Sequence, residues 1–206
     1  MTGAITMTIN TERNARHAAR MARKKAVIDA HIAEANIDTG IMILLTGNGK
    51  GKSSSAFGMV ARAIGHGLKV GVVQFIKNRT DTGEEALLGK HCEWHVMGDG
   101  FTWETQNFEA DKLKSEEAWA VAARMLGDAS YDVVILDELT YCLSYNYLDK
   151  DTIIKDIESR PEMQHVVVTG RAAVKELHEI ADTVTVLNDE KHAYKAGIKA
   201  QKGLEW

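Results

Sequence analysis

The segment best suited to chemistry is a run of glycines and lysines over residues 46–53, which reads Thr-Gly-Asn-Gly-Lys-Gly-Lys-Ser. Glycines let the backbone turn tightly, so that successive N–H groups point at one anion. A helix is expected directly after the run, and its first turn adds a partial positive charge. The run therefore predicts a phosphate-binding loop. The alternative, a plain glycine-rich turn, leaves both lysines and the helix start unexplained.

Two side chains of this loop carry most of its chemistry. Lys52 can reach phosphate oxygens, and the Ser53 hydroxyl can bind Mg²⁺. Lys50 adds a second positive charge beside the phosphates, or alternatively faces solvent. The usual pattern begins with a glycine that is separated from Gly-Lys by four residues, and Thr46 stands there instead. The predicted nucleotide ligands from the loop are Gly47, Asn48, Gly49, Lys50, Gly51, Lys52, Ser53 and Ser54.

A second group of chemical interest is an acidic pair after an aliphatic run. Residues 133–136 read Val-Val-Ile-Leu and are followed by Asp137 and Glu138. Carboxylates at the carboxyl end of a buried strand lie at the edge where open α/β sheets bind ligands. They can hold Mg²⁺ directly or through water, so the predicted metal ligands are Ser53, Asp137 and Glu138, with Mn²⁺ as a substitute ion. The alternative is an acidic pair that only complements a helix dipole.

Two arginines are candidates for the same anion. Arg62 falls in the helix after the loop, and Arg171 follows another predicted strand in the sequence Thr-Gly-Arg. Arginine is favoured for two-pronged recognition of phosphate. Both are predicted to contact the triphosphate or the ribose, and the alternative for each is a surface salt bridge. Loop and acidic pair together define a nucleoside-triphosphate site, but neither says which bond of the nucleotide breaks.

The elements that position these groups alternate between short aliphatic runs and longer helical segments. Such alternation is typical of a doubly wound α/β fold with a mainly parallel sheet, and continuous apolar runs are typical of strands covered on both faces. Helices are expected over 52–66, 84–89, 108–127, 138–158 and 172–180. The expected strands are Ile41–Thr46, Val70–Phe75, Cys92–Met97, Tyr131–Leu136, His165–Thr169 and Thr183–Leu187.

Both ends of the chain differ from this alternating region. Residues 1–10 are expected to form a loose tail, and residues 12–36 an extra N-terminal helix rich in Ala, Arg and Lys. We therefore predict an N-terminal tail and basic helix over 1–40 and one nucleotide-binding domain over 41–206. The last residues, 189–206, have no clear period and are expected to wrap the edge of the sheet.

Composition excludes several classes of protein. The 206 residues carry a net charge of −4, which does not suit a nucleic-acid binder. Residues 11–25 hold six basic residues against one acidic residue, or +5, so the rest of the chain carries −9. No apolar run is long enough for a membrane span, and the start lacks the pattern of a secretory signal. The two isolated cysteines suit a reducing compartment, so a cytoplasmic location is expected.

The chain resembles the ATP:corrinoid adenosyltransferases of the cobalamin pathway, a class with a phosphate loop. The resemblance runs from about residue 41 to the end, and the pairing of FTWETQ with GNGKGK is the specific part. The matching stretches are TGNGKGKSSSAFGMVARAIGHG (46–67), VGVVQFIKN (70–78), MGDGFTWETQN (97–107), DVVILDELTY (132–141), VVVTGR (166–171) and KHAYKAGIKAQKGLEW (191–206). Ser53 stands where the family usually has Thr, which keeps a hydroxyl.

The resemblance implies a RecA-like member of the P-loop NTPase fold and a transferase reaction. Such enzymes move the 5′-deoxyadenosyl group of ATP to the Co(I) of a reduced corrinoid and release triphosphate. Lys50 and Lys52 would stabilise the charge that grows on the leaving triphosphate. Phe101 and Trp103 would form an apolar wedge below the corrin ring that excludes the lower axial ligand. The alternative for both aromatics is a place in the core.

The resemblance also implies partners. The corrinoid could be cobalamin, cobinamide or cobyrinic acid a,c-diamide, an electron-donating flavoprotein could supply the reductant, and a homodimer is expected. The basic N-terminal helix would then cover a corrinoid site, and its alternative is a solvated charged face. Two rival functions remain at this stage: a conventional ATPase or small-molecule kinase, and a non-enzymatic corrinoid carrier.

Overall fold

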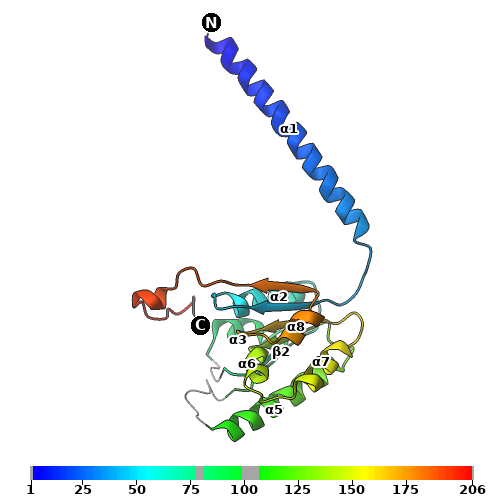
Figure 1. Ribbon diagram of the computed structural model, residues 1–206, viewed down its shortest axis with the longest axis vertical. Coiled ribbons are helices and arrows are strands. Elements are labelled where there is room, and N and C mark those ends of the chain that lie inside the picture. The colour runs from blue at the N-terminus through cyan, green and yellow to red at the C-terminus, as the bar shows by residue number, and fades with distance from the viewer. Residues whose placement is uncertain (1, 78–80, 99–106, 206) are drawn as a thin grey trace. The chain divides into compact units, whose positions relative to one another are not determined.

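The chain forms two compact units, Met1–Asp38 and Thr39–Trp206. The computed structural model describes residues 2–77, 81–98 and 107–205, with side chains from Thr11 onward. Figure 1 shows a single helix in the first unit and a sheet covered by helices in the second.

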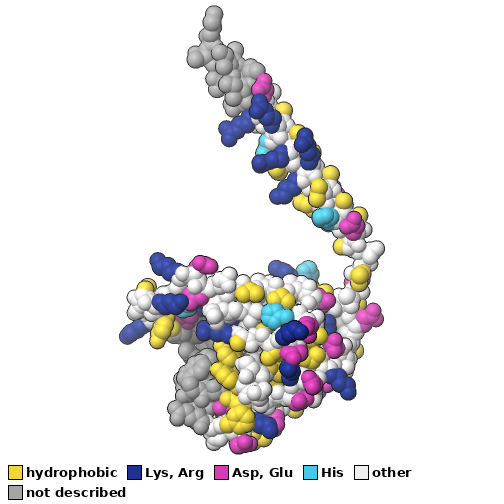
Figure 2. Space-filling view, in the orientation of Figure 1, with side chains coloured by type: hydrophobic (Ala, Val, Ile, Leu, Met, Phe, Trp, Pro, Cys, Tyr) yellow, Lys and Arg dark blue, Asp and Glu magenta, His cyan; other side chains and the backbone are white. Residues whose placement is uncertain are grey.

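The first unit is helix α1, Thr2–Glu34. It includes residues 2–10, so the prediction of a loose tail there is wrong. Those residues contain no proline, and a helix already nucleated by the Ala- and Arg-rich segment extends by one hydrogen bond per added residue. Pairs one turn apart, Arg16–Glu12 at 3.2 Å and Lys25–Asp29 at 2.5 Å, support its exposed surface. Figure 2 shows basic and apolar side chains interleaved along this helix.

The second unit is built on a six-stranded sheet in the order β3-β2-β4-β5-β1-β6, with every described pairing parallel. The predicted α/β fold with a parallel sheet is confirmed, and each expected strand is present within two residues of its expected bounds. The strands are β1 Met42–Thr46, β2 Val70–Gln74, β3 Glu93–Val96, β4 Val133–Asp137, β5 His165–Thr169 and β6 Thr183–Val186.

Helices cover both faces of this sheet and bury an apolar core on each. One face packs against α2 and α3, with Phe57 and Val60 among the buried side chains. The other face packs against α5, α6, α7 and α8 and buries Trp119, Met125 and Leu139. The helix bounds are α2 Lys52–Gly65, α3 Gly83–Leu88, α5 Phe108–Leu126, α6 Leu139–Ser144, α7 Lys150–Glu158 and α8 Lys175–Ile180.

The single helix predicted over 138–158 is instead two. Asn146 adopts a left-handed φ of 58° just after α6 and turns the chain. Asp149 then begins α7, because its side chain accepts a hydrogen bond from the Thr152 N–H at 2.9 Å. Tyr147 and Leu148 between the two helices are buried in the core, which explains why their apolar character resembled a continuing helix.

The last strand and the C-terminal segment also differ from expectation. β6 lies at the edge of the sheet and its four residues are exposed, so it is not covered on both faces. A short 3₁₀ helix, η1 Ala193–Ala196, follows. Against the expectation that this segment wraps the sheet's edge, its end reaches the phosphate loop, where Glu205 pairs with Lys50 at 2.5 Å.

No helix among the described residues has both the length and the apolar character that crossing a membrane requires.

Candidate active site

Polar side chains end four neighbouring strands in the middle of the sheet. Gln74, Asp137, Thr169 and Thr46 are the last residues of β2, β4, β5 and β1, and all four are at most 5% exposed. The strands are parallel, so these residues form one row at the carboxyl edge. Ligand sites of open α/β sheets lie at this edge. The row is therefore the floor of the candidate site.

Asp137 is the centre of this floor and is fully buried. Its Oδ2 accepts hydrogen bonds from Gln74 Nε2 at 2.9 Å and from Lys77 Nζ at 2.8 Å, and its Oδ1 accepts one from the Thr169 hydroxyl at 2.7 Å. Burial by itself would raise the pKa of Asp137, but the Lys77 charge and these hydrogen bonds hold it below its usual value. The carboxylate is therefore ionised in the folded protein.

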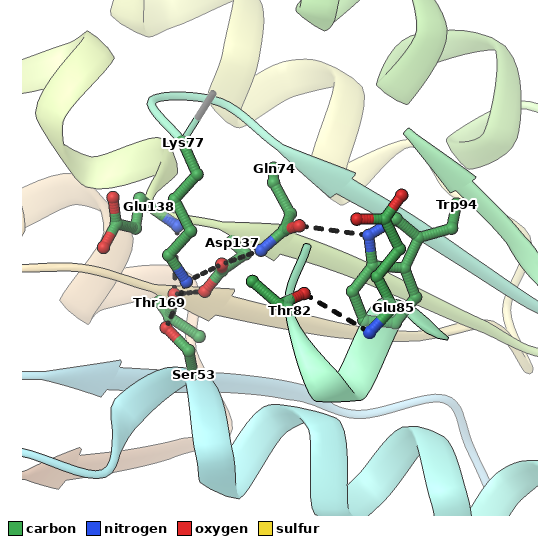
Figure 3. A network of polar contacts seen from close by, with 9 residues as sticks. All are labelled: Ser53, Gln74, Lys77, Thr82, Glu85, Trp94, Asp137, Glu138 and Thr169. Carbon is green, nitrogen blue, oxygen red and sulfur yellow. Dashed lines mark hydrogen bonds and ion pairs between the residues drawn. The ribbon is translucent and has the colours of Figure 1, made fainter. Parts of the chain in front are cut away.

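Lys77 connects the acidic strand end to the phosphate loop. Its ammonium lies 3.2 Å from the Ser53 hydroxyl and 2.8 Å from Asp137 Oδ2. Figure 3 shows the nitrogen between these two side chains. Burial opposes its charge, but Asp137 and Glu138 outweigh that effect and raise the pKa of Lys77 above its ordinary value. Two predicted metal ligands, Ser53 and Asp137, are thus bridged by a lysine.

Glu138 sits beside this network in a strained conformation. Its φ of 65° is left-handed and places it at the start of α6, and its N–H donates to the Thr169 hydroxyl at 3.0 Å. Its Oε2 is buried and has no hydrogen-bond partner among the described residues. Burial, and then the neighbouring Asp137 charge, raise the pKa of Glu138 to about 7. An unpartnered buried carboxylate oxygen of this kind suits an external ligand.

The phosphate loop is tied to the edge strand. The Leu187 N–H donates to the Thr46 carbonyl at 2.8 Å, and the Gly49 N–H donates to the Leu187 carbonyl at 2.7 Å. The first bond shows that Thr46 still belongs to β1, so the first position of the loop does not need a glycine. The chain turns only afterwards, at Gly47 and Gly51, whose φ angles of 99° and 114° favour glycine.

Helix α2 begins at the end of this loop and presents its N-terminus to the site. Gly51 stands at its N-cap and no described side chain caps the helix, so the first N–H groups stay available for an anion. Lys52, its first residue, donates to the Gly49 carbonyl at 2.7 Å. Burial and the nearby Arg171 charge lower the pKa of Lys52. A bound polyanion would neutralise that concentration of positive charge.

Of the remaining predicted nucleotide ligands, Ser54 and Lys50 lie at or beside the loop, whereas Arg62 does not. Ser54 is exposed in the first turn of α2, and the half-exposed Lys50 meets Glu205 rather than only solvent. Arg62, by contrast, lies in the last turn of α2. It is ten residues beyond Lys52, a rise of about 15 Å. The structure thus does not bring Arg62 to the phosphate loop.

A cavity of about 530 Å³ opens beside the loop. Asn48 and Arg171 line one part of it, and the C-terminal segment lines the rest. Its lining carries more positive than negative side chains, which suits an anionic or polar ligand. The lining residues from the C-terminal segment are Asp189, His192, Ala193, Tyr194, Lys195, Ile198, Lys199, Ala200 and Glu205.

The two aromatic residues predicted to form the wedge, Phe101 and Trp103, lie outside the described residues. The chain on their N-terminal side is described. β3 ends at Val96, whose register partner is Gln74, so the segment leaves the sheet at the same carboxyl edge as the site.

Sequence reasoning missed Gln74, Lys77 and Thr169 as members of the site. A signal was available for Thr169, because β5 ends an apolar run with a polar residue as β4 does, but Gln74 is followed by the apolar Phe75 and Ile76. A polar residue that ends a buried strand at the carboxyl edge is positioned for a ligand or for a neighbouring functional group. Nothing in the spacing of Lys77 indicates that its ammonium reaches Ser53.

Comparison with known proteins shows which family the chain belongs to. Residues 38–206 match the family ATP:corrinoid adenosyltransferase BtuR/CobO/CobP, and residues 5–32 match the family Cob(I)alamin adenosyltransferase N terminal. A corrinoid adenosyltransferase of Pseudomonas aeruginosa is 56% identical over 203 residues, covering 97% of this chain and all of that protein. One of Escherichia coli K12 is 48% identical and one of Salmonella typhimurium 47%, each over 93% of this chain and 98% of that protein. The chain belongs to the ATP:corrinoid adenosyltransferase family and is an enzyme.

The first prediction concerns the join between the loop and β6. A Cβ at Gly47 would lie 2.4 Å from the Leu187 carbonyl oxygen, and φ there is left-handed. Gly47→Ala should therefore lower the free energy of unfolding by more than about 1 kcal/mol and weaken ATP binding. Gly67→Ala is the matched control, because Gly67 has a φ of 76° but open space around it. Equal losses in the two variants, measured by chemical denaturation, would contradict the role given to Leu187.

The second prediction concerns Glu138. Its folded pKa of about 7 lies above the ordinary 4.5, so the folded state holds the proton more tightly. The contribution of Glu138 to the free energy of unfolding is fully present below about pH 4.5. It is lost as the pH rises to and through about 7. Glu138→Gln should shrink the fall in unfolding free energy between pH 5 and pH 8 by roughly 2–3 kcal/mol. Denaturation at both pH values checks this, and an unchanged pH dependence would refute it.

Proposed function

We propose that the chain transfers the 5′-deoxyadenosyl group of ATP to the Co(I) of a reduced corrinoid at the carboxyl edge of the sheet, and releases triphosphate. Membership of the family over nearly the whole chain is the observation that carries this proposal. The local geometry supports it, because the site collects groups that bind a polyanion.

The loop residues 47–54 and the N-terminus of α2 are proposed to hold the triphosphate. The Co(I) of the corrinoid is itself the nucleophile, and the bond that breaks joins C5′ of the ribose to the triphosphate oxygen. The protein's task is then to stabilise the charge that grows on the leaving group. Fixed N–H groups, Lys52, Lys50 and Arg171 supply positive charge that need not reorganise during the reaction.

Ser53, Asp137 and Glu138 are proposed to hold Mg²⁺, with Mn²⁺ as a substitute. The donor set fits, because it consists of oxygen atoms of the kind that Mg²⁺ prefers, and Glu138 Oε2 is buried without a partner among the described residues. When bound, the ion would neutralise charge on the triphosphate. Thr169 keeps Asp137 oriented by its 2.7 Å hydrogen bond.

The cavity beside the loop is proposed to take the nucleoside part of ATP. It begins at Asn48, directly next to the triphosphate position, and Arg171 and the C-terminal segment line it. Arg171 could then contact either the ribose or the triphosphate. The ion pair between Lys50 and Glu205 holds the end of the C-terminal segment against the loop.

Phe101 and Trp103 are proposed to form an apolar wedge beneath the corrin ring. Co(I) is four-coordinate, so the lower axial ligand must leave before or during reduction. Apolar side chains on that face would exclude the ligand and water and make the reduction easier.

Helix α1 is proposed to contribute to a homodimer. Helix α1 carries exposed Val27, Ile28 and Ile32 alongside its basic residues, which suits a helix that covers a corrinoid site in a homodimer. We also propose a cytoplasmic location and an electron-donating flavoprotein as reductant. Cobalamin, cobinamide and cobyrinic acid a,c-diamide are the candidate corrinoids.

The proposed reaction is tested by its phosphorus-containing product. Protein, ATP, Mg²⁺ and a corrinoid reduced to Co(I) should yield triphosphate, detected by phosphorus NMR, in amounts equal to the alkylated corrinoid seen in visible spectra. ADP with a phosphorylated acceptor would indicate a kinase and contradict the proposal. Binding of both ligands without alkylation would indicate a carrier and contradict it as well.

A third prediction tests the role of Lys52. Lys52→Ala should weaken ATP binding about 10–100-fold, because a charge-assisted contact to phosphate is lost. Isothermal titration calorimetry measures this directly. Arg62→Ala is the control from the same helix, and it should bind ATP like the unmodified chain because Arg62 lies at the opposite end. Unchanged ATP affinity in Lys52→Ala would show that the loop assignment is wrong.

A fourth prediction tests the wedge. The double variant Phe101→Ala with Trp103→Ala should keep ATP affinity within about twofold. It should lose most activity when the corrinoid is supplied as Co(II) with a mild reductant, yet keep activity when Co(I) is supplied ready-made. Equal rates from Co(II) in the double variant and the unmodified chain would reject the wedge.

A further inference from the structure

The position between the phosphate loop and the acidic strand end already holds a cation. Lys77 places its ammonium 3.2 Å from Ser53 Oγ and 2.8 Å from Asp137 Oδ2. These are two of the three side chains proposed above as metal ligands. Figure 3 shows the ammonium where their side chains converge.

Lys77 is required there in the nucleotide-free protein. Asp137 is fully buried, and a buried carboxylate without a counter-ion is strongly unfavourable. Gln74 and Thr169 contribute hydrogen bonds to this carboxylate but no charge. Within the described residues, the ammonium of Lys77 is the only ion paired with Asp137.

A divalent ion bound to Ser53 and Asp137 would compete with this ammonium. Both cations would need the same oxygen atoms, and Asp137 Oδ2 already accepts from Gln74 as well. Two positive charges a few ångströms apart in a partly buried site repel strongly. Occupation by the metal and by the Lys77 ammonium is therefore mutually exclusive.

We propose that Lys77 holds the metal position in the nucleotide-free protein and gives it up when the triphosphate and the divalent ion arrive together. Lysine suits this task, because its charge sits on a flexible four-carbon stem and needs no fixed geometry. The triphosphate supplies the anion that the displaced ammonium can pair with. The divalent ion then replaces it as the counter-ion of Asp137.

This inference rests on the proposed function for the identity of the nucleotide. It adds the order in which the nucleotide and the divalent ion bind. The free protein should bind divalent ions weakly, so that the metal enters as its ATP complex. Lys77 thus prevents the acidic pair from capturing an ion before the nucleotide is present. Its role is positioning: it controls the metal site and does not touch the reacting carbon.

The experiment measures Mn²⁺ binding to the nucleotide-free protein, with free Mn²⁺ counted by electron paramagnetic resonance. The unmodified chain should bind Mn²⁺ weakly. Lys77→Met, which keeps the length of the side chain and removes its charge, should bind Mn²⁺ at least about tenfold more tightly. Equal or weaker binding by Lys77→Met would overturn the proposal, and so would tight binding by the unmodified chain.

Two controls separate this effect from a general change of charge. Lys50→Met removes the same charge from the loop, but Lys50 pairs with Glu205 and not with Asp137. It should change Mn²⁺ affinity by no more than about threefold, because solvent and salt screen an exposed charge. Adding Asp137→Asn to Lys77→Met should abolish the gain. A tenfold gain in Lys50→Met, or a gain that survives Asp137→Asn, would overturn the proposal.

Folding of the variant gives a second readout. If Lys77→Met is unstable without metal, Mn²⁺ should raise its unfolding temperature in proportion to the logarithm of Mn²⁺ concentration. The unmodified chain should show little such stabilisation. Failure of Mn²⁺ to stabilise or rescue the variant would refute the proposal. None of these measurements requires adenosyl transfer, so their failure is distinguishable from failure of the proposed function.

Discussion

The buried carboxylate of Asp137 is the constraint on which the rest of the site depends. It cannot remain charged inside the sheet without compensation, so Gln74 from β2, Thr169 from β5 and Lys77 all direct hydrogen bonds to it. Through Lys77 the network reaches Ser53 at the start of α2. One electrostatic requirement thereby joins three neighbouring strands, β2, β4 and β5, and the phosphate loop into a single preorganised surface.

The strands, the phosphate loop and the acidic pair of this site could be predicted from the sequence. Apolar or β-branched runs predicted all six strands; the signal is strongest where burial is continuous, as in β2 and β4, and β6 is recognised by its alternating Thr and Val although it is exposed. The loop over 46–53 and the acidic residues Asp137 and Glu138 could also be recognised. Glycines with lysines, and paired carboxylates, are unusual directly after an aliphatic run. Their meeting at one edge follows from the parallel order of the strands, which the alternation of strand and helix already implied.

What could not be predicted depends on contacts between distant segments. The bond from Lys77 to Ser53 spans 24 residues, and the pairing of Lys50 with Glu205 spans 155. The break between α6 and α7 depends on a left-handed Asn146, which propensity does not reveal. The position of Arg62 depends on helix geometry in a related way, because ten residues of helical rise separate it from Lys52 at the loop.

The central claim is that this edge binds the triphosphate as a leaving group, so that the bond broken lies at C5′ of the ribose. Carbon NMR of the reaction with ATP labelled with ¹³C at C5′ tests it most directly. We predict that the labelled carbon loses its coupling to phosphorus and appears as a methylene bonded to cobalt. A label that keeps its phosphorus coupling, in ADP or in unchanged ATP, while the corrinoid remains unalkylated would contradict the account.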